Sequence, residues 1–221
     1  IRQREDVVSI VSHDLRNPLG VVLAASDLLV DLPLDENERM RQAEIIGRSG
    51  RRMHGLIEDL LDVSRIEADA FVMRPSMEEV FPVLEEARTF FSDQAERAGV
   101  QLTVEKGAAE LTSRIDRDRI LQALSNLLDN ALRHTPRGGS VALAAGEGAG
   151  FIAGSVTVDG AGVEPAVLVQ LFDRFSQSTR GGGAGLGLAI VKGVAEGHGG
   201  EVSVTSRFGE GAIFKIRLPG D

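Results

Sequence analysis

The chain is organised around the stretch Ser12-His13-Asp14-Leu15-Arg16-Asn17-Pro18-Leu19-Gly20. Apolar residues recur on both sides of it at spacings of three and four, which indicates a long amphipathic helix ending near Val30. His13 lies on the flank of the apolar face. Pro18 lacks a backbone donor and crowds the carbonyl of the residue four positions earlier, so we expect a kink beside the histidine. An imidazole is a competent nucleophile near neutral pH, and an adjacent carboxylate can hold one ring N–H. We therefore interpret His13 as a candidate nucleophile, with Asp14 as its orienting base.

A second amphipathic helix follows the turn at residues 31–35. Pro33 breaks the first helix, and Asp35 is the expected N-cap of the next one. Apolar residues line one side of this second helix, which ends near 64–71. Two helices cannot enclose so wide an apolar stripe, so we predict that two chains pair their hairpins in a dimeric four-helix bundle. The alternative is a hairpin packed against another part of the same chain.

Composition narrows the classes of partner and compartment. The 221 residues carry a net charge of −9 and include no cysteine. The acidic balance disfavours nucleic acid or an anionic membrane as the main partner, and disulfides and thiolate metal sites are excluded. No apolar run approaches the roughly 20 residues of a membrane span, so we expect a cytoplasmic location, with a membrane tether upstream left open. The chain begins in mid-pattern without methionine, and we expect a longer protein with a sensory region upstream.

The pattern changes near residues 74–76, and we predict two domains, 1–70 and 71–221. The second shows the periodicities of an α+β unit with helices on one face of a mixed sheet. Helices are expected at 77–98, 117–133, 165–171 and 186–196, and strands at 100–104, 111–115, 140–145 and 151–158, with a closing hairpin of 201–206 and 212–218.

Two asparagines mark the expected helix 117–133. Asn126 and Asn130 are four residues apart and share one face, with Arg133 and His134 about one turn further on. Amide carbonyls are hard oxygen ligands that suit magnesium, and arginine can neutralise phosphate. Asparagines that bond to neighbouring loops are the alternative.

Three further motifs follow in the second domain. Asp159-Gly160-Ala161-Gly162 comes after a strand, where residues without side chains let backbone approach a ligand. Leu171-Phe172-Asp173-Arg174-Phe175 precedes a glycine run, and its phenylalanines could equally be core residues. In the run itself, five of the seven residues from Gly181 to Gly187 are glycine, and it leads directly into a helix. Free N–H groups and the helix dipole favour an anion there, such as a triphosphate.

The order and spacing of these motifs resemble those of sensor histidine kinases over nearly the whole chain. The His13 stretch resembles their phosphoacceptor box, the run Asn126–Thr135 their asparagine box, and the three later motifs their first glycine, phenylalanine and second glycine boxes. The resemblance implies a phosphoacceptor hairpin followed by an ATP-binding α/β sandwich of the gyrase and histidine-kinase type. It also implies ATP and Mg²⁺ as cofactors, a homodimer, and a response-regulator receiver domain as partner in a bacterial two-component system.

The resemblance assigns roles to individual residues. His13 would be the phosphoacceptor, aided by Asp14, and Asn17 would orient a water for dephosphorylating the regulator. Asn130 would bind magnesium, and His134 would lie against the adenine. The remaining nucleotide-binding residues would be Asn126, Arg133, Asp159, Gly160, Gly162, Phe175, Gly183, Gly185, Leu186, Gly187 and Leu188, with residues 176–182 as a short lid.

One position departs from the family pattern. The family has an aspartate two residues before the first glycine, where it accepts a hydrogen bond from the adenine amino group; here Val158 holds that place and Asp159 follows it. Side chains alternate along a strand, so the shift points the carboxylate to the other face unless the strand is bulged. In a regular strand the lost contact would cost about 1–3 kcal/mol, or roughly one to two decades in affinity.

We therefore expect an ATP-dependent protein-histidine kinase that phosphorylates His13 and then an aspartate of a response regulator. Dephosphorylation of the regulator is a second expectation. The alternative, favoured by Val158, is a homologue with impaired nucleotide binding that acts as a dimeric scaffold or as a phosphatase. A chaperone-like or topoisomerase-like ATPase would not explain the His13 helix.

Overall fold

The structure is a computed structural model of the chain, and it describes residues 2–105, 111–148, 151–174 and 185–220. The elements of the N-terminal part are α1 (Arg2–Asp31) and α2 (Glu36–Glu67). Those of the C-terminal part are β1 (Ser76–Glu79), α3 (Val80–Ala98), β2 (Gln101–Glu105), β3 (Thr112–Ile115), α4 (Arg117–His134), β4 (Ser140–Gly148), β5 (Phe151–Val158), α5 (Pro165–Leu168), α6 (Gly187–Gly197), β6 (Glu201–Arg207) and β7 (Gly211–Pro219).

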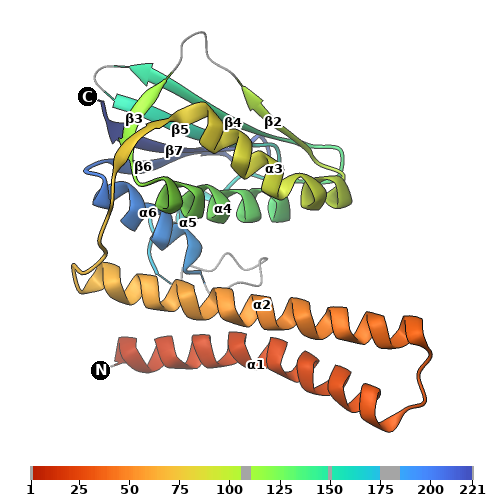
Figure 1. Cartoon of the computed structure of the whole chain (residues 1–221). Helices are drawn as coiled ribbons and strands as arrows, with labels where there is room; N and C mark the ends of the chain where they lie inside the picture. Colours follow the sequence, from red (N-terminus) through yellow and green to blue (C-terminus); the bar gives the residue numbers. More distant parts are fainter. Residues whose placement is uncertain (1, 106–110, 149–150, 175–184, 221) are drawn as a thin grey trace.

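The two long helices form the predicted hairpin (Figure 1). Asp35 caps α2 through a capping box, because its Oδ1 accepts a bond from the Glu38 N–H at 2.8 Å and Glu38 accepts one from the Asp35 N–H at 3.2 Å. Pro18 lies inside α1, which continues past it as a helix and changes direction part-way along its length (Figure 1). In the described part of the chain, no helix has the length and apolar character needed to cross a membrane.

The C-terminal part is built on a five-stranded mixed sheet of order β2-β4-β5-β7-β6. The β2–β4 pair is parallel and the others are antiparallel. Helices α3, α4 and α6 cover one face of this sheet (Figure 1). Buried side chains from both layers form the core, including Leu128, Leu143 and Ile190 at 0% exposure. The predicted α+β arrangement of helices on one face of a mixed sheet is confirmed.

Two predicted helices are wrong at their ends. Residues 77–79, predicted as helix, belong to β1 (Ser76–Glu79), which pairs antiparallel with β3 in a separate two-stranded sheet. A helix that began at Met77 would place the Pro82 ring against the carbonyl of Glu78, whereas in α3 the proline falls in the first turn, where it is tolerated. The short helix predicted at 165–171 ends at Leu168.

Candidate active site

His13 and Asp14 form a polar pair on α1. The His13 Nδ1 lies 3.1 Å from the Asp14 Oδ1, and the side chain of His13 is 70% exposed. When Nδ1 carries the proton and donates it to this carboxylate, the lone pair resides on Nε2. The largely exposed His13 ring then presents Nε2 away from Asp14, and its role as a nucleophile stays a prediction.

One side of the His13–Asp14 pair is buried and the other side is exposed. Asp14 is only 18% exposed, and its Oδ2 is buried with no hydrogen-bond partner among the described residues. Pro18 is buried, whereas Asn17 is exposed and lies one turn from His13. His13 and Asn17 can therefore both contact a partner that approaches α1.

Asn126 joins α4 to the start of α6. A Cβ placed on Gly187 would lie 3.4 Å from the Asn126 Cγ and Oδ1, so the asparagine side chain rests directly on the first residue of α6. Its Nδ2 is buried and has no hydrogen-bond partner in the part of the chain that the structure describes. A buried amide donor without an acceptor is unfavourable by about 1–3 kcal/mol, and a phosphate oxygen would satisfy it.

The other predicted residues of α4 lie near its C-terminal end. Asn130 is half-buried. Arg133 is paired with Asp129 across one helical turn, with 2.5 Å between Nη2 and Oδ2, so its guanidinium is engaged within the helix. Partial burial lowers the pKa of His134, and the nearby Arg133 adds to this effect while Asp129 opposes it, so the neutral form of the imidazole is favoured.

The glycines that follow β5 pack against protein backbone. A Cβ on Gly160 would lie 2.9 Å from the carbonyl oxygen of His134, so the loop sits on the C-terminal end of α4. Gly162 has φ +68°, and a Cβ there would overlap the carbonyl of Arg207 in the β6–β7 turn. Packing accounts for both glycines, and their role in ligand binding stays a prediction.

The end of β5 is regular, with no bulge. Val158 pairs with Val141 on one side and Ala212 on the other, and it is buried at 7% exposure. Asp159 is exposed, and its Oδ2 accepts hydrogen bonds from the backbone N–H and the hydroxyl of Ser140. The carboxylate is thus held at the start of β4, and valine occupies the buried position.

The described part of the glycine run leads into α6. Gly185 has φ +67°, which favours glycine, and Leu186 is buried at 2% exposure and anchors the run in the core. Leu186 at the N-cap makes no side-chain hydrogen bond to α6, so among the described residues no side-chain cap uses the first N–H groups of this helix. Gly187 and Leu188 form its first turn. Phe175 and Gly183 lie outside the described residues, as does the predicted lid.

Two family models match the chain in the order that the geometry suggests. Residues 3–69 match the His Kinase A (phospho-acceptor) domain, and residues 115–221 match the family described as Histidine kinase-, DNA gyrase B-, and HSP90-like ATPase. The chain belongs to the histidine kinase family. The His13 pair lies within the first match, and the α4 and α6 residues lie within the second.

Curated relatives align with nearly the whole length of this chain. It is 35% identical to the histidine protein kinase DivJ of Caulobacter vibrioides over 95% of this chain and 36% of that protein. It is 31% identical to the sensor protein SrrB of Staphylococcus aureus, over 99% of this chain and 38% of that protein. The chain thus spans little more than a third of the length of these relatives.

Solved structures share the fold. The Acinetobacter baumannii histidine kinase AdeS has a TM-score of 0.73 at 21% identity and covers 95% of this chain and 98% of its own. Full-length ShkA in complex with AMPPNP has a TM-score of 0.73 at 29% identity, over 97% of this chain and 45% of ShkA. The histidine kinase ThkA in complex with the response regulator protein TrrA has a TM-score of 0.71 at 21% identity, over all of this chain and 64% of that one.

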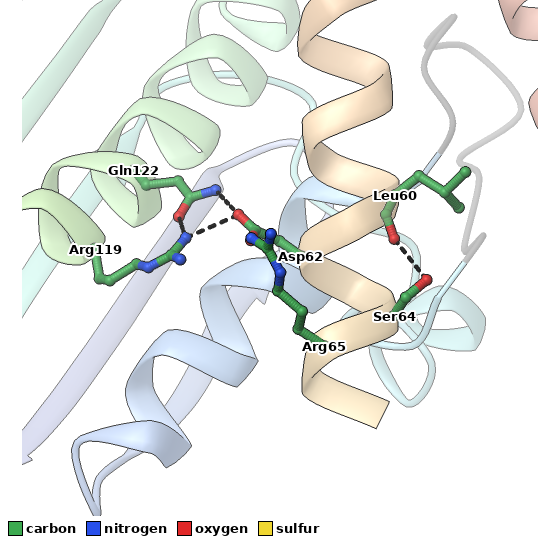
Figure 2. Close-up of polar contacts among 6 residues, drawn as sticks. All are labelled: Leu60, Asp62, Ser64, Arg65, Arg119 and Gln122. Carbon is green, nitrogen blue, oxygen red and sulfur yellow. Dashed lines mark hydrogen bonds and ion pairs between the residues drawn. The ribbon is translucent and has the colours of Figure 1, made fainter. Parts of the chain in front are cut away.

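One polar cluster was not predicted from the sequence. Asp62 of α2 is 3% exposed and bonds to Arg119 and Gln122 of α4 (Figure 2). The signal in the sequence is an acid between Leu61 and Val63 in an apolar run, which requires a partner if it is buried. The cluster joins the two parts of this family member.

Proposed function

We propose that this chain is the catalytic part of an ATP-dependent protein-histidine kinase that phosphorylates its own His13 and passes the phosphoryl group to an aspartate of a response regulator. The observation that supports it most is the His13–Asp14 pair, which fixes one ring nitrogen and leaves the other free. We further propose the division into a hairpin, 1–70, and an ATP-binding domain, 71–221.

The chemistry of transfer rests on His13 and Asp14. ATP, when bound, would supply its γ-phosphoryl group: as His13 Nε2 bonds to the γ-phosphorus, the bond from that phosphorus to the bridging oxygen would break and ADP would leave. The Asp14 carboxylate holds the Nδ1–H and stabilises the positive charge that develops on the ring as Nε2 bonds to phosphorus. Asp14 thus orients the His13 imidazole from the adjacent position on α1, and most of the rate enhancement comes from the positioning of the reacting groups.

The nucleotide would bind between α4 and the start of α6. The orphaned Nδ2 of Asn126 fits a phosphate oxygen as acceptor, and the uncapped N-terminus of α6 favours an anion. Mg²⁺ binds through one or two protein groups together with phosphates and water, so the Asn130 amide oxygen suits that role. The neutral His134 ring suits a contact with the base.

The hairpin supports a homodimer and a docking surface for a regulator. Apolar side chains remain exposed along it, which is the surface a second hairpin would cover: they include Leu19, Val21, Leu23, Leu28, Ile57 and Leu61. The receiver domain of a response regulator would approach the exposed His13, and Asn17 would orient a water for the reverse, phosphatase reaction.

Val158 supports a second candidate function. A buried valine cannot accept a hydrogen bond from a base, and Asp159 is held by Ser140. Weakened nucleotide binding would leave a dimeric scaffold or a response-regulator phosphatase.

Incubation with γ-labelled ATP and magnesium distinguishes the two functions. The kinase forms a label that is stable to alkali and labile to acid, and that disappears in His13→Ala. Absence of label in the unaltered chain, with label appearing in Val158→Asp, supports the second function instead.

A further inference from the structure

The hairpin and the ATP-binding domain meet along one face of the last turns of α2. Val63 is 5% exposed and belongs to the same core cluster as the residues of α4 and α6. Ile66 occupies the space that a side chain at Gly193 of α6 would need, so the two helices approach closely there. Glu67 forms an ion pair with Arg174.

A polar node lies at the centre of this contact. The Asp62 Oδ2 accepts hydrogen bonds from the Arg119 Nη1 at 2.8 Å and from the Gln122 Nε2 at 2.7 Å, and the same Nη1 donates to the Gln122 Oε1 at 2.8 Å. Figure 2 shows Asp62 directed from α2 toward these two side chains. Three groups from two domains therefore satisfy one another in a closed ring.

Neighbouring side chains hold this ring of hydrogen bonds in place. Arg65 donates to the other Asp62 oxygen at 3.1 Å from the outer side. The guanidinium carbon of Arg119 lies 4.2 Å from the centroid of the Phe71 ring, in the segment that connects the domains. A carboxylate as buried as Asp62 is strongly unfavourable without its cation. The node therefore stabilises only the arrangement in which Arg119 and Gln122 of α4 face Asp62 of α2.

The docked arrangement separates the nucleotide site from His13. Figure 1 shows α2 lying between α1 and the ATP-binding domain, while His13 is on α1 with its side chain largely exposed. The contact that docks the domain thus keeps it beside the helix that lacks the phosphoacceptor.

We propose that Asp62, Arg119 and Gln122 form an interdomain latch that holds the ATP-binding domain on α2, and that this latch opens before the domain reaches His13. The first half stands on the contacts alone. The second half rests on the proposed kinase function.

The absence of cysteine from the chain allows a direct measurement of docking. Cysteines introduced at the exposed positions Arg16 on α1 and Gln170 in the ATP-binding domain carry spin labels, and excess unlabelled chain dilutes the labelled chain in each dimer. Electron–electron distance measurements then give the populations of docked and undocked domain. We expect one dominant distance in the parent chain.

Breaking the node shifts these populations. Asp62→Asn and Arg119→Gln each raise the undocked-to-docked ratio at least about tenfold, and the double variant adds little to either single one because both act through one contact. Glu86→Gln is the matched control, since it breaks the ion pair of Arg117 on α4 without touching α2. Circular dichroism confirms that each variant is folded. Distances unchanged in both Asp62→Asn and Arg119→Gln would overturn the latch.

The rate of phosphohistidine formation tests whether the latch must open before the domain reaches His13. With ATP saturating, Asp62→Asn raises the rate several-fold if the latch restrains the domain. A lower rate in a variant whose domain is undocked would overturn the proposal, because docking would then assist transfer. If no phosphohistidine forms in any variant, the kinase function fails, while the distances still decide whether the latch exists.

Discussion

The Nδ1 of His13 lies 3.1 Å from the Oδ1 of Asp14, so a proton on Nδ1 can be donated to this carboxylate while the lone pair resides on Nε2. Asp14→Asn keeps the size of the side chain but removes the charge that orients and stabilises the ring. We expect the rate of autophosphorylation to fall about 10²-fold, with nucleotide affinity unchanged. Initial rates of label incorporation measure this. His54→Gln, at an exposed histidine of α2, is the control, and an Asp14→Asn rate equal to that of the control would contradict the assignment.

We predict that Val158 limits the affinity of the chain for nucleotide. Because β5 is regular, Val158→Asp places a carboxylate at the buried position, and we expect it to tighten ATP binding by about 10- to 100-fold. The same change lowers the stability of the nucleotide-free protein, since it buries a charge. Calorimetric titration gives the affinity. Asp159→Asn should leave it unchanged, because Ser140 holds that carboxylate; equal effects of the two substitutions would refute this interpretation.

We predict that Asn126 lowers the stability of the free protein and contributes to nucleotide binding. Asn126→Leu replaces an unsatisfied buried amide by an apolar group of similar size, so we expect the nucleotide-free protein to gain about 1 kcal/mol and the affinity for ATP to fall at least about tenfold. Thermal unfolding with and without Mg²⁺ and ATP reports both effects. Asn37→Leu, at an exposed position of α2, should change neither. A loss of stability in Asn126→Leu would mean that its Nδ2 has an acceptor in the free protein.

Asp59 makes stability depend on pH. Burial and the carboxylates of Asp62 and Asp129 raise its pKa from 3.8 to about 6. The folded chain therefore binds this proton more tightly than the unfolded chain, so the contribution is greatest below pH 3.8 and is lost as the pH rises through about 6. Asp59→Asn removes the penalty and should stabilise the chain by about 1–2 kcal/mol near pH 7.5, a value reduced for partial exposure.

Urea unfolding of parent and Asp59→Asn chains near pH 7.5 and near pH 4.5 checks the sign. The difference between the two chains should shrink at the lower pH, where Asp59 of the parent is protonated. The exposed acid Asp93 of α3 provides the control Asp93→Asn. The same difference at both pH values would exclude Asp59 as the titrating group.

Features that depend on local sequence could be predicted. The Asp35 cap and the pattern of the strand predicted at 151–158 depend on nearby residues, and both elements are present. Spacing singled out Asn126 and glycine content singled out Gly187, and the structure brings these two residues into contact. These signals need no knowledge of the tertiary structure.

Features that depend on residues far apart in the sequence could not be predicted. β1 has mostly exposed residues and no apolar alternation, so only its pairing with β3 defines it as a strand. Asp62 and Arg119 are 57 residues apart, and nothing near either residue specifies the other. Gly160 and Gly162 suggested a ligand in the sequence. In the structure, backbone from the end of α4 and from the β6–β7 turn fills the space beside them, and the sequence does not show that these distant segments meet there.

The position of the phosphoryl group shows which nitrogen of His13 is the nucleophile. Nuclear magnetic resonance of the chain after incubation with ATP and magnesium distinguishes phosphorus bonded to Nε2 from phosphorus bonded to Nδ1. We expect a single phosphohistidine, at the Nε2 of His13, because Asp14 holds the Nδ1–H. Phosphorus at Nδ1, or on another residue while His13 stays unmodified, would contradict it.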